Sequence, residues 1–466
     1  MPLAKSITPK KTNALRRILP VFFSLLLLLI LGPVYGQDNS PYTRYGLGDL
    51  VPSTNINTRA LGGISTGYND FFSINFNNPS SYSFFQAVRE ANSKKLAYGR
   101  AILDMGLNIE NRSLVQPGNT EKFTASNALF SYVQLGVPLR NNWGMSFGLR
   151  PVSRISYKMS QVSRIYDPNT NLPIDSVVTS NQGDGGAYLA SLGTGFRIGK
   201  LSLGVNGGYL FGKKDYSARR AFLNDTVQYI SGNFQTTTTF GSLYFNAGFQ
   251  YQIIVDSSTF ITLGGYGNLQ QSLRASQDQI RETYVYDQNS GNVQIDSVFA
   301  SKDLRGRIEY PASYTAGITI QHMPGLKKSG WLLGVDYHQS NWKDYRFYGQ
   351  ADSLRNNWEL RLGAELRPSL SASRKGYWGN VAYRAGFFLG NDYVQVKQKL
   401  PLLGFTFGMG MPLRNTNRLN NQVTFINLAV EYIKRGNNSN LLRENLFRIS
   451  AGFSLSDLWF IRKKYE

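Results

Sequence analysis

The stretch of sequence that decides the fold is GAYLASLGTGFRIGKLSLGVNGGYLFG, residues 186–212. From Tyr188 to Ile198 every second residue is mostly apolar, while the residues between them are mostly glycine and serine. After the short link Gly199-Lys200, the same alternation returns from Leu201 to Phe211. A period of two is that of a β-strand, whose successive side chains point to opposite faces. The stretch therefore predicts a hairpin with one lipid-like face and one face of small or polar side chains.

The same pattern recurs along the chain and predicts about fourteen strands. Further apolar sets begin at Leu243, Trp358, Leu403 and Phe447, and each is close to the ~9–11 residues that a tilted strand needs to cross a membrane. Strands in lipid must close into a barrel, because every backbone group has to be paired. We therefore predict an all-β protein, a transmembrane antiparallel β-barrel. Its strands are predicted at 95–112, 122–139, 143–165, 185–199, 201–219, 234–255, 259–287, 293–322, 330–349, 354–368, 377–390, 393–412, 422–435 and 443–456.

The connections between these strands alternate in length. Even-numbered connections such as Arg140-Asn141-Asn142 and Gly199-Lys200 are short, and we predict that they are periplasmic turns. Odd-numbered connections include the longest polar stretches, as expected of extracellular loops. Two of these, 165–177 and 285–298, begin on Ile-Tyr-Asp and Val-Tyr-Asp, both end on Ile-Asp-Ser-Val, and turn residues lie between their arms. We predict that both are extended hairpins.

The N-terminus predicts export. Residues 1–36 contain five lysines and arginines and no acid, and an apolar run extends from Ile18 to Leu31. Small residues precede Gln37, so we predict a signal peptide cleaved after Gly36. A helical anchor is the alternative, because the apolar run is only slightly shorter than the ~18 residues that suggest a membrane span. With no cysteine after the cut, lipoprotein processing is excluded, and the predicted location is the outer membrane.

The basic composition does not point to nucleic acid. The formal net charge is +21 and falls to +16 once the five signal cations are removed, but the charges are scattered and the chain is exported. Attraction to anionic lipid head groups or a general compositional bias explains the balance equally well. The chain has no cysteine, so it cannot form disulfides. Its first predicted partner is therefore the lipid bilayer of the outer membrane.

Residues 37–94 break the alternation and predict a different structure. They are rich in asparagine, serine, glycine and phenylalanine, and turn-forming sequences such as Asn78-Pro79-Ser80 occur within them. Glycines permit tight turns in a confined space. We predict an N-terminal plug inside the barrel lumen, followed by the barrel at 95–466.

The plan of a plug segment with Asn78-Pro79-Ser80 followed by about fourteen strands resembles the FadL-type family of outer-membrane transporters. Two stretches are similar to divergent members of that family, the opening Ser40-Pro41-Tyr42-Thr43-Arg44-Tyr45-Gly46-Leu47-Gly48 and the ending Gly452-Phe453-Ser454-Leu455-Ser456-Asp457-Leu458-Trp459-Phe460. The resemblance covers the whole mature chain. It implies passage of long-chain fatty acids and other hydrophobic molecules. In the family this tripeptide is typically Asn-Pro-Ala and lies in a plug whose movement opens a path. The resemblance therefore implies that Asn78, Pro79 and Ser80 belong to the substrate path, although Ser80 is a departure.

The resemblance also implies a lateral route through an irregular third strand. The third predicted strand contains Pro151, which cannot donate to a strand ladder and must mark a bulge or broken pairing inside a barrel. We predict a lateral opening beside Pro151. The alternative is a proline near the strand end with no opening.

Inward positions of the predicted strands carry charges of both signs. Because buried charges need partners, we predict ion pairs between strands or between strand and plug. Arg384 and Arg448 are further candidates for binding a carboxylate head group, because arginine matches carboxylate geometry. The inward set is Asp336, His338, Ser340, Glu359, Arg361, Glu365, Arg367, Arg384, Glu431 and Arg448.

An enzymatic reading rests on one short motif. His338-Gln339-Ser340-Asn341 resembles the His-x-Ser-Asn element of outer-membrane phospholipase, in which histidine activates serine. In that enzyme the pair faces lipid, whereas the phase here places His338 and Ser340 inside. We therefore predict no enzyme. With two histidines and no cysteine, we predict no metal site and no cofactor.

Three functions remain in competition. The leading prediction is passive diffusion of hydrophobic small molecules, such as long-chain fatty acids, through a lateral opening. The alternative is a non-transporting scaffold or shuttle barrel in protein secretion or surface attachment, with secreted or surface proteins as partners. A general water-filled porin is the third candidate and predicts a large single-channel conductance.

Overall fold

The computed structural model describes residues 40–89, 96–119, 121–223, 230–287, 291–369, 376–413 and 422–459. The predicted signal-peptide cleavage site lies outside these residues. Fourteen antiparallel strands form a closed ring, in which the last strand pairs with the first. The fold predicted from the alternation is therefore confirmed. In chain order the ring contains β3 (Leu96–Val115), β4 (Lys122–Arg140), β5 (Trp143–Tyr166), β6 (Pro173–Ile198), β7 (Leu201–Phe222), β8 (Ser231–Ile254), β9 (Thr259–Asn268), β12 (Ser313–His322), β13 (Gly330–Ser340), β15 (Asn357–Arg367), β16 (Ala382–Val396), β17 (Gln398–Leu413), β18 (Val423–Arg435) and β19 (Arg443–Trp459).

The predicted alternation of faces is present in the barrel wall. Tyr188 and Leu192 are 44% and 52% exposed, whereas Leu189 between them is 3% exposed. Phe405 and Phe407 point outward in the same way. An outer surface of large apolar side chains around a polar interior is the pattern of a barrel in lipid, and it places the chain in the outer membrane. No helix within the described residues has the length and apolar character that a membrane crossing would require.

Several predicted strands were wrong in extent. β13 ends at Ser340 and not at 349, the predicted link 391–392 lies within β16, and two predicted segments each contain two long strands. The predicted strand 259–287 divides into β9 and β10 (Gln271–Asp287), and 293–322 divides into β11 (Gly291–Tyr310) and β12. β9 pairs directly with β12, so β10 and β11 leave the ring as a hairpin that pairs with β8. Pro311 lies at one of the two breaks, where the missing N–H ends the ladder. The count of fourteen survives because one barrel strand lies in each predicted segment.

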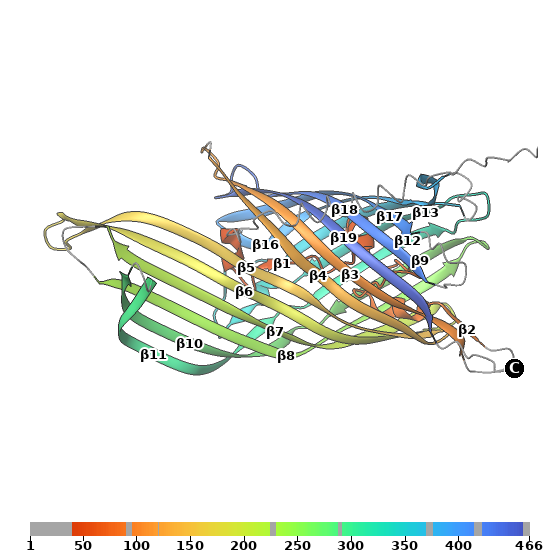
Figure 1. Ribbon diagram of the computed structural model, residues 1–466, viewed down its shortest axis with the longest axis horizontal. Helices are drawn as coiled ribbons and strands as arrows, with labels where there is room; N and C mark the ends of the chain where they lie inside the picture. Colours follow the sequence, from red (N-terminus) through yellow and green to blue (C-terminus); the bar gives the residue numbers. More distant parts are fainter. Residues whose placement is uncertain are drawn as a thin grey trace, which may run out of the picture. The chain divides into compact units, whose positions relative to one another are not determined.

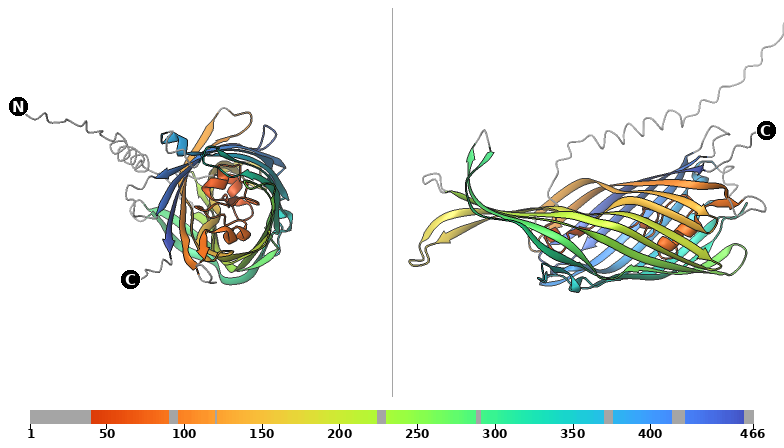
Figure 2. Two further views of the ribbon diagram at one scale, coloured as in Figure 1. Left: turned by 90° about the vertical axis from the view of Figure 1, so that its right-hand side faces the viewer. Right: turned by 90° about the horizontal axis from the view of Figure 1, so that it is seen from below.

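One side of the barrel continues far beyond the other. The hairpins β5–β6, β7–β8 and β10–β11 form a curved sheet that extends from the end with the long connections (Figures 1 and 2). Both connections predicted as extended hairpins belong to this sheet, and β6 begins at Pro173, upstream of the predicted 185. We call this sheet the overhang. The rule of long extracellular loops predicts that this end of the barrel faces the cell exterior, and we call it the exterior end.

The N-terminal segment lies within the ring of strands (Figure 2). Its short elements are η1 (Pro41–Arg44), β1 (Asp49–Leu50), α2 (Ile56–Arg59), η2 (Pro79–Phe84) and β2 (Ala87–Arg89). It runs from the exterior end, where the Tyr42 hydroxyl donates to the Leu442 carbonyl, to the start of β3, which pairs with β2. The connection after β13 folds inward above it through η3 (Trp342–Asp344) and β14 (Arg346–Phe347), while η5 (Trp378–Asn380) precedes β16. A role for the segment as a plug remains a prediction.

Candidate functional site

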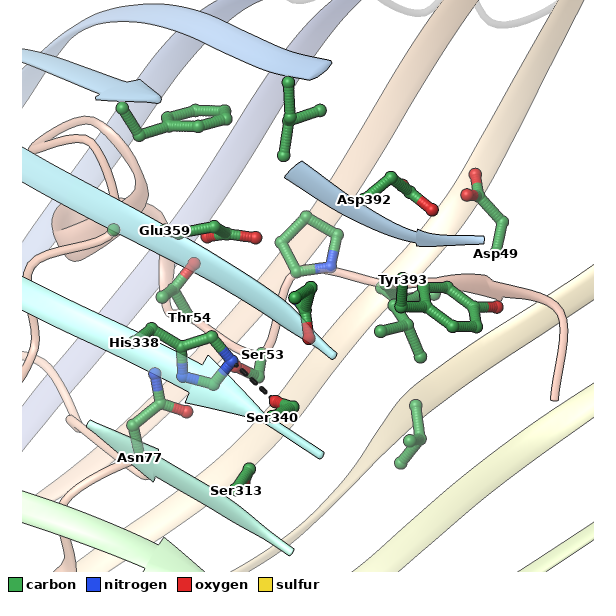
Figure 3. A pocket seen from close by; sticks show the side chains of 18 of the residues that line it. Asp49, Ser53, Thr54, Asn77, Ser313, His338, Ser340, Glu359, Asp392 and Tyr393 are labelled. Atoms are coloured by element: carbon green, nitrogen blue, oxygen red, sulfur yellow. Dashed lines mark hydrogen bonds between the residues drawn. The ribbon is translucent and has the colours of Figure 1, made fainter. Parts of the chain in front are cut away.

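A cavity of about 290 Å³ lies in the lumen between residues 49–54 of the N-terminal segment and the surrounding strands (Figure 3). One part of its wall is aromatic and includes Tyr244, Tyr310, Trp342 and Tyr393. The rings of Trp342 and Tyr393 pack with centroids 4.4 Å apart and belong to the buried cluster at the exterior end. The cavity is therefore closed toward the exterior end by the same buried residues against which the connection after β13 packs.

The opposite wall of the cavity is charged and paired. Asp49 forms ion pairs with Arg112 and with Arg435, the latter at 3.1 Å, and both arginines also contact Glu444. Burial of Asp49 would raise its carboxyl pKa, but the two guanidinium groups outweigh burial and hold this pKa below its ordinary value. β1 is thereby tied electrostatically to β3 and β18.

The predicted ion pairing is confirmed for the inward arginines and glutamates, whereas the buried Asp336 instead accepts from the backbone N–H groups of Ser65 and Thr66. Arg448 donates to Glu110 at 2.7 Å and Glu431 at 3.0 Å, and Arg361 binds Glu359 at 2.7 Å. Elsewhere in the lumen, Glu365 binds both Arg367 and Arg384. Of the two head-group candidates, Arg448 lines the cavity, whereas Arg384 is not among its lining residues. Their binding of a substrate stays a prediction.

Asn78, Pro79 and Ser80 lie away from the cavity, toward the end with the short turns. The Asn78 side chain caps η2 by accepting from the Ser80 backbone N–H, and it donates to Thr66 and Phe249 carbonyls. The backbone of Pro79 packs so closely on Gly204 that a Cβ there would lie 2.3 Å from the Pro79 carbonyl carbon. The glycine-rich inner face predicted from the alternation is the surface that admits this close contact.

The ladder between β4 and β5 ends early. Its last pair toward the exterior is Val133 with Leu149, although both strands continue. Directly beyond, the β5–β6 ladder shifts register between Pro151 and Ser153. We call this break the seam. The bulge predicted at Pro151 is present in the backbone pairing, and passage of a substrate there stays a prediction.

Two contacts cover the seam. β1 pairs with β5 at Ser153 and Arg154, and the Val51 N–H donates to the Val152 carbonyl at 3.0 Å. Across the seam, the Arg154 guanidinium donates to the Asn127 side chain of β4 at 3.1 Å. The free edge of β5 is thus partly occupied by the N-terminal segment.

Arg150 and Val152 line the cavity on either side of Pro151. The Arg150 guanidinium lies 5.5 Å from the centre of the Phe76 ring, and in the described residues it forms no ion pair or hydrogen bond. Every other lining arginine makes hydrogen bonds to acids or to several neutral groups. Sequence analysis missed Arg150, although its position before Pro151 was an available signal. It also missed Asp49, which lies in a stretch without periodicity.

His338 and Ser340 face the cavity, as their phase predicted, and lie at hydrogen-bonding distance (Figure 3). The Ser340 Oγ is 2.9 Å from His338 Nε2, and the Thr315 Oγ1 is 2.8 Å from His338 Nδ1. Glu359 lies opposite His338 in the neighbouring strand. Among the described residues, no three His, Asp or Glu side chains are grouped as metal ligands would be.

The family model named BamG matches residues 16–466, which is nearly the whole chain. The chain belongs to the BamG family. The FadL-type family expected from sequence is therefore corrected at the level of family membership, although the barrel plan that motivated it is present. This BamG-family chain has no match among curated proteins.

Solved structures similar to this BamG-family chain include other outer-membrane barrels. A Pseudomonas aeruginosa FadL homologue shares 14% identity over 89% of this chain and 100% of its own, with a TM-score of 0.49. The P. putida toluene transporter TodX shares 14% identity over 86% of this chain and 97% of its own, with a TM-score of 0.45. The Ralstonia pickettii toluene transporter TbuX shares 12% identity over 88% of this chain and 99% of its own, with a TM-score of 0.45.

Proposed function

We propose that this barrel passes hydrophobic small molecules, such as long-chain fatty acids, across the outer membrane by passive diffusion through the seam. The observation that carries the proposal is the early end of the β4–β5 ladder beside a cavity that Arg150 and Val152 line. A molecule in the cavity has the lipid phase on the other side of the seam, because Phe147 and Phe130 point outward on the flanking strands.

The chemistry of the wall near the seam suits an amphipathic molecule. Val152, Leu189 and Leu210 offer an apolar surface, and the unpaired Arg150 offers donors to a carboxylate. The paired charges on the far wall would stay in their ion pairs. A general porin would not be expected to combine an apolar surface with a single unpaired arginine. It would have a wide water-filled channel and a large single-channel conductance.

Substitution of Pro151 by valine tests this function. Valine restores a backbone N–H at the bulge and favours continued pairing, so flux of a long-chain fatty acid into proteoliposomes should fall several-fold. Pro412→Val on β17 is the matched control, because Pro412 lies in an uninterrupted ladder with Phe425. Unchanged uptake by the Pro151 variant would sink the proposal.

A scaffold function is the second candidate, and the overhang favours it. Val162, Leu172 and Val298 of the overhang are 64%, 64% and 69% exposed, which suits contact with another protein. The name of the BamG family is consistent with an association with the Bam complex. Stoichiometric recovery of protein partners with the purified barrel, without bound lipid by mass spectrometry, would favour this function over transport.

A further inference from the structure

We infer that His338 and Ser340 form a serine nucleophile and its general base, able to cleave carboxylic esters that enter the lumenal cavity. The inference does not rest on the proposed transport, because it concerns a reaction inside the cavity and is read out without flux. The inward phase that argued against lipid-facing phospholipase chemistry is the feature that places both side chains in this cavity.

The hydrogen bonds around the imidazole fix its orientation. Thr315 Oγ1 lies 2.8 Å from Nδ1 and Ser340 Oγ lies 2.9 Å from Nε2, and the proposed reaction uses the tautomer in which Nδ1–H donates to Thr315. Nε2 then accepts the Ser340 proton. This is the arrangement that a general base needs to activate a hydroxyl. Thr315 is a positioning residue, since it acts through the ring.

The neighbouring strand β15 supplies the groups around the pair. Glu359, opposite His338 in register, is bound to Arg361 at 2.7 Å, so the ring faces a paired acid and base and not a free negative charge. Asn357 lies opposite Ser340 and also lines the cavity, so its amide is the candidate donor to the oxyanion.

The proposed step is acyl transfer followed by hydrolysis. Ser340 Oγ attacks the ester carbonyl carbon while its proton moves to His338 Nε2, and the carbon–oxygen bond to the alcohol then breaks. The proton on His338 passes to the leaving alkoxide. Water next attacks the acyl-serine and gives a proton to His338, which returns it to Ser340 Oγ. The net reaction converts an ester and water to an acid and an alcohol.

The substrate class follows from the surrounding wall. Tyr266, Tyr310 and Trp342 also line the cavity and provide apolar surface, while its volume of about 290 Å³ limits the part of a substrate that can enter. An ester with a small alcohol or a short acyl group fits this space. A bulky diacyl lipid does not.

Covalent labelling of the folded full-length barrel tests the inference. The purified protein is treated with a small dialkyl fluorophosphate, and the product is followed by intact mass and peptide mapping. We expect one adduct on Ser340, absent from Ser340→Ala, and a labelling rate at least a hundredfold lower in His338→Gln. Ser313→Ala is the matched control, because Ser313 lines the same cavity and lies opposite Ser340 on β12 without a bond to His338.

A pH profile separates the base from a structural role. The labelling rate of the unmodified protein should rise with pH as His338 loses its proton, whereas the small residual rate of His338→Gln should lack that step. Thr315→Val should shift the step, and Thr315→Ser should restore it. Each variant is first shown to fold by heat-modifiable migration. No adduct on Ser340 of the folded protein, or equal labelling of His338→Gln, would overturn the inference.

Discussion

The two ends of the N-terminal segment are held in the barrel by different forces. At η2, backbone packs directly against the glycine-lined wall, as at Pro79 on Gly204. At β1, attachment consists of a two-residue pairing with β5 and the ion pairs of Asp49. Close packing can be released only by moving many atoms, whereas ion pairs respond to a single charge. The comparison indicates that β1, next to the seam, is the end that can detach.

The largest effect is expected for Asp49→Ala. It leaves the buried Arg112 and Arg435 with one acid fewer, which costs about 3 kcal/mol at this site. Because the chain has no native cysteine, a cysteine introduced by Ser53→Cys can be labelled with maleimide to report the detachment of β1 from β5. Asp49→Ala should raise the rate of this labelling about a hundredfold. Asp167→Ala, in an exposed loop, is the control.

A second cysteine reporter, placed in η2, tests whether the two ends of the N-terminal segment differ. Ser81→Cys lies in η2 and is 5% exposed, so its labelling should not change when Asp49 is replaced. If both reporters respond equally, the segment moves as one body and the two ends do not differ.

A smaller effect, about 2 kcal/mol, is expected for Gly204→Ala. The new Cβ would meet the Pro79 carbonyl carbon at 2.3 Å, so η2 must shift. Thermal unfolding should move to lower temperature, and Ser81→Cys should become reactive while Ser53→Cys changes less. Gly207→Ala is the matched control, because its Cβ would meet only the Phe245 ring, at 3.3 Å. Equal destabilisation by both alanines would contradict the close-packing account.

Alone among these effects, the release of β1 should depend on pH. Because the pKa of Asp49 is lowered in the folded protein, its ion pairs stabilise β1 at every pH above the ordinary carboxyl value of 3.8. That stabilisation is lost as the pH falls below 3.8 through the folded value. Ser53→Cys, read with an acid-tolerant thiol reagent, should therefore react faster at low pH, and the Asp49→Asn background should remove the dependence. A pH response that persists in that background would assign the switch to another group.

The smallest effect is expected for Asn127→Ala. The variant loses one partly buried hydrogen bond to Arg154 across the seam, which contributes about 1 kcal/mol. Fatty-acid flux should rise by less than about fivefold. Ser126→Ala, on the outer face of the same strand, should leave flux unchanged. A decrease in flux with Asn127→Ala would indicate that the bridge forms part of the route.

The sequence predicts the barrel well because lipid acts on each strand locally. Leu192 and Phe405 point outward for a reason that their own neighbours reveal, namely the two-residue period. The division of β9 from β10 could not be predicted in the same way. The alternation continues through both, and only the partner strand distinguishes a wall strand from the overhang.

The site was predictable only in part for the same reason. Ion pairing of the inward charges follows from the cost of burying an unpaired charge, and Glu365 with Arg384 confirms it. The identity of the partners across the lumen does not follow from that cost. Asp49 meets Arg112 and Arg435, far along the chain, and no periodicity marks an acid in an irregular segment. The bulge at Pro151 was predictable because proline lacks a donor whatever its surroundings.

The pairing of β19 with β3 has a consequence for the order of assembly. Tyr42 lies at the exterior end of the lumen, and β2 pairs with the start of β3 at the other end, so the described N-terminal residues traverse the barrel lengthwise. If the barrel closed first, the N-terminal segment would have to enter the closed lumen afterward with charged side chains that end up buried. We therefore expect the strands to close around a segment that already lies along their inner face, with the pairing of β19 and β3 forming last.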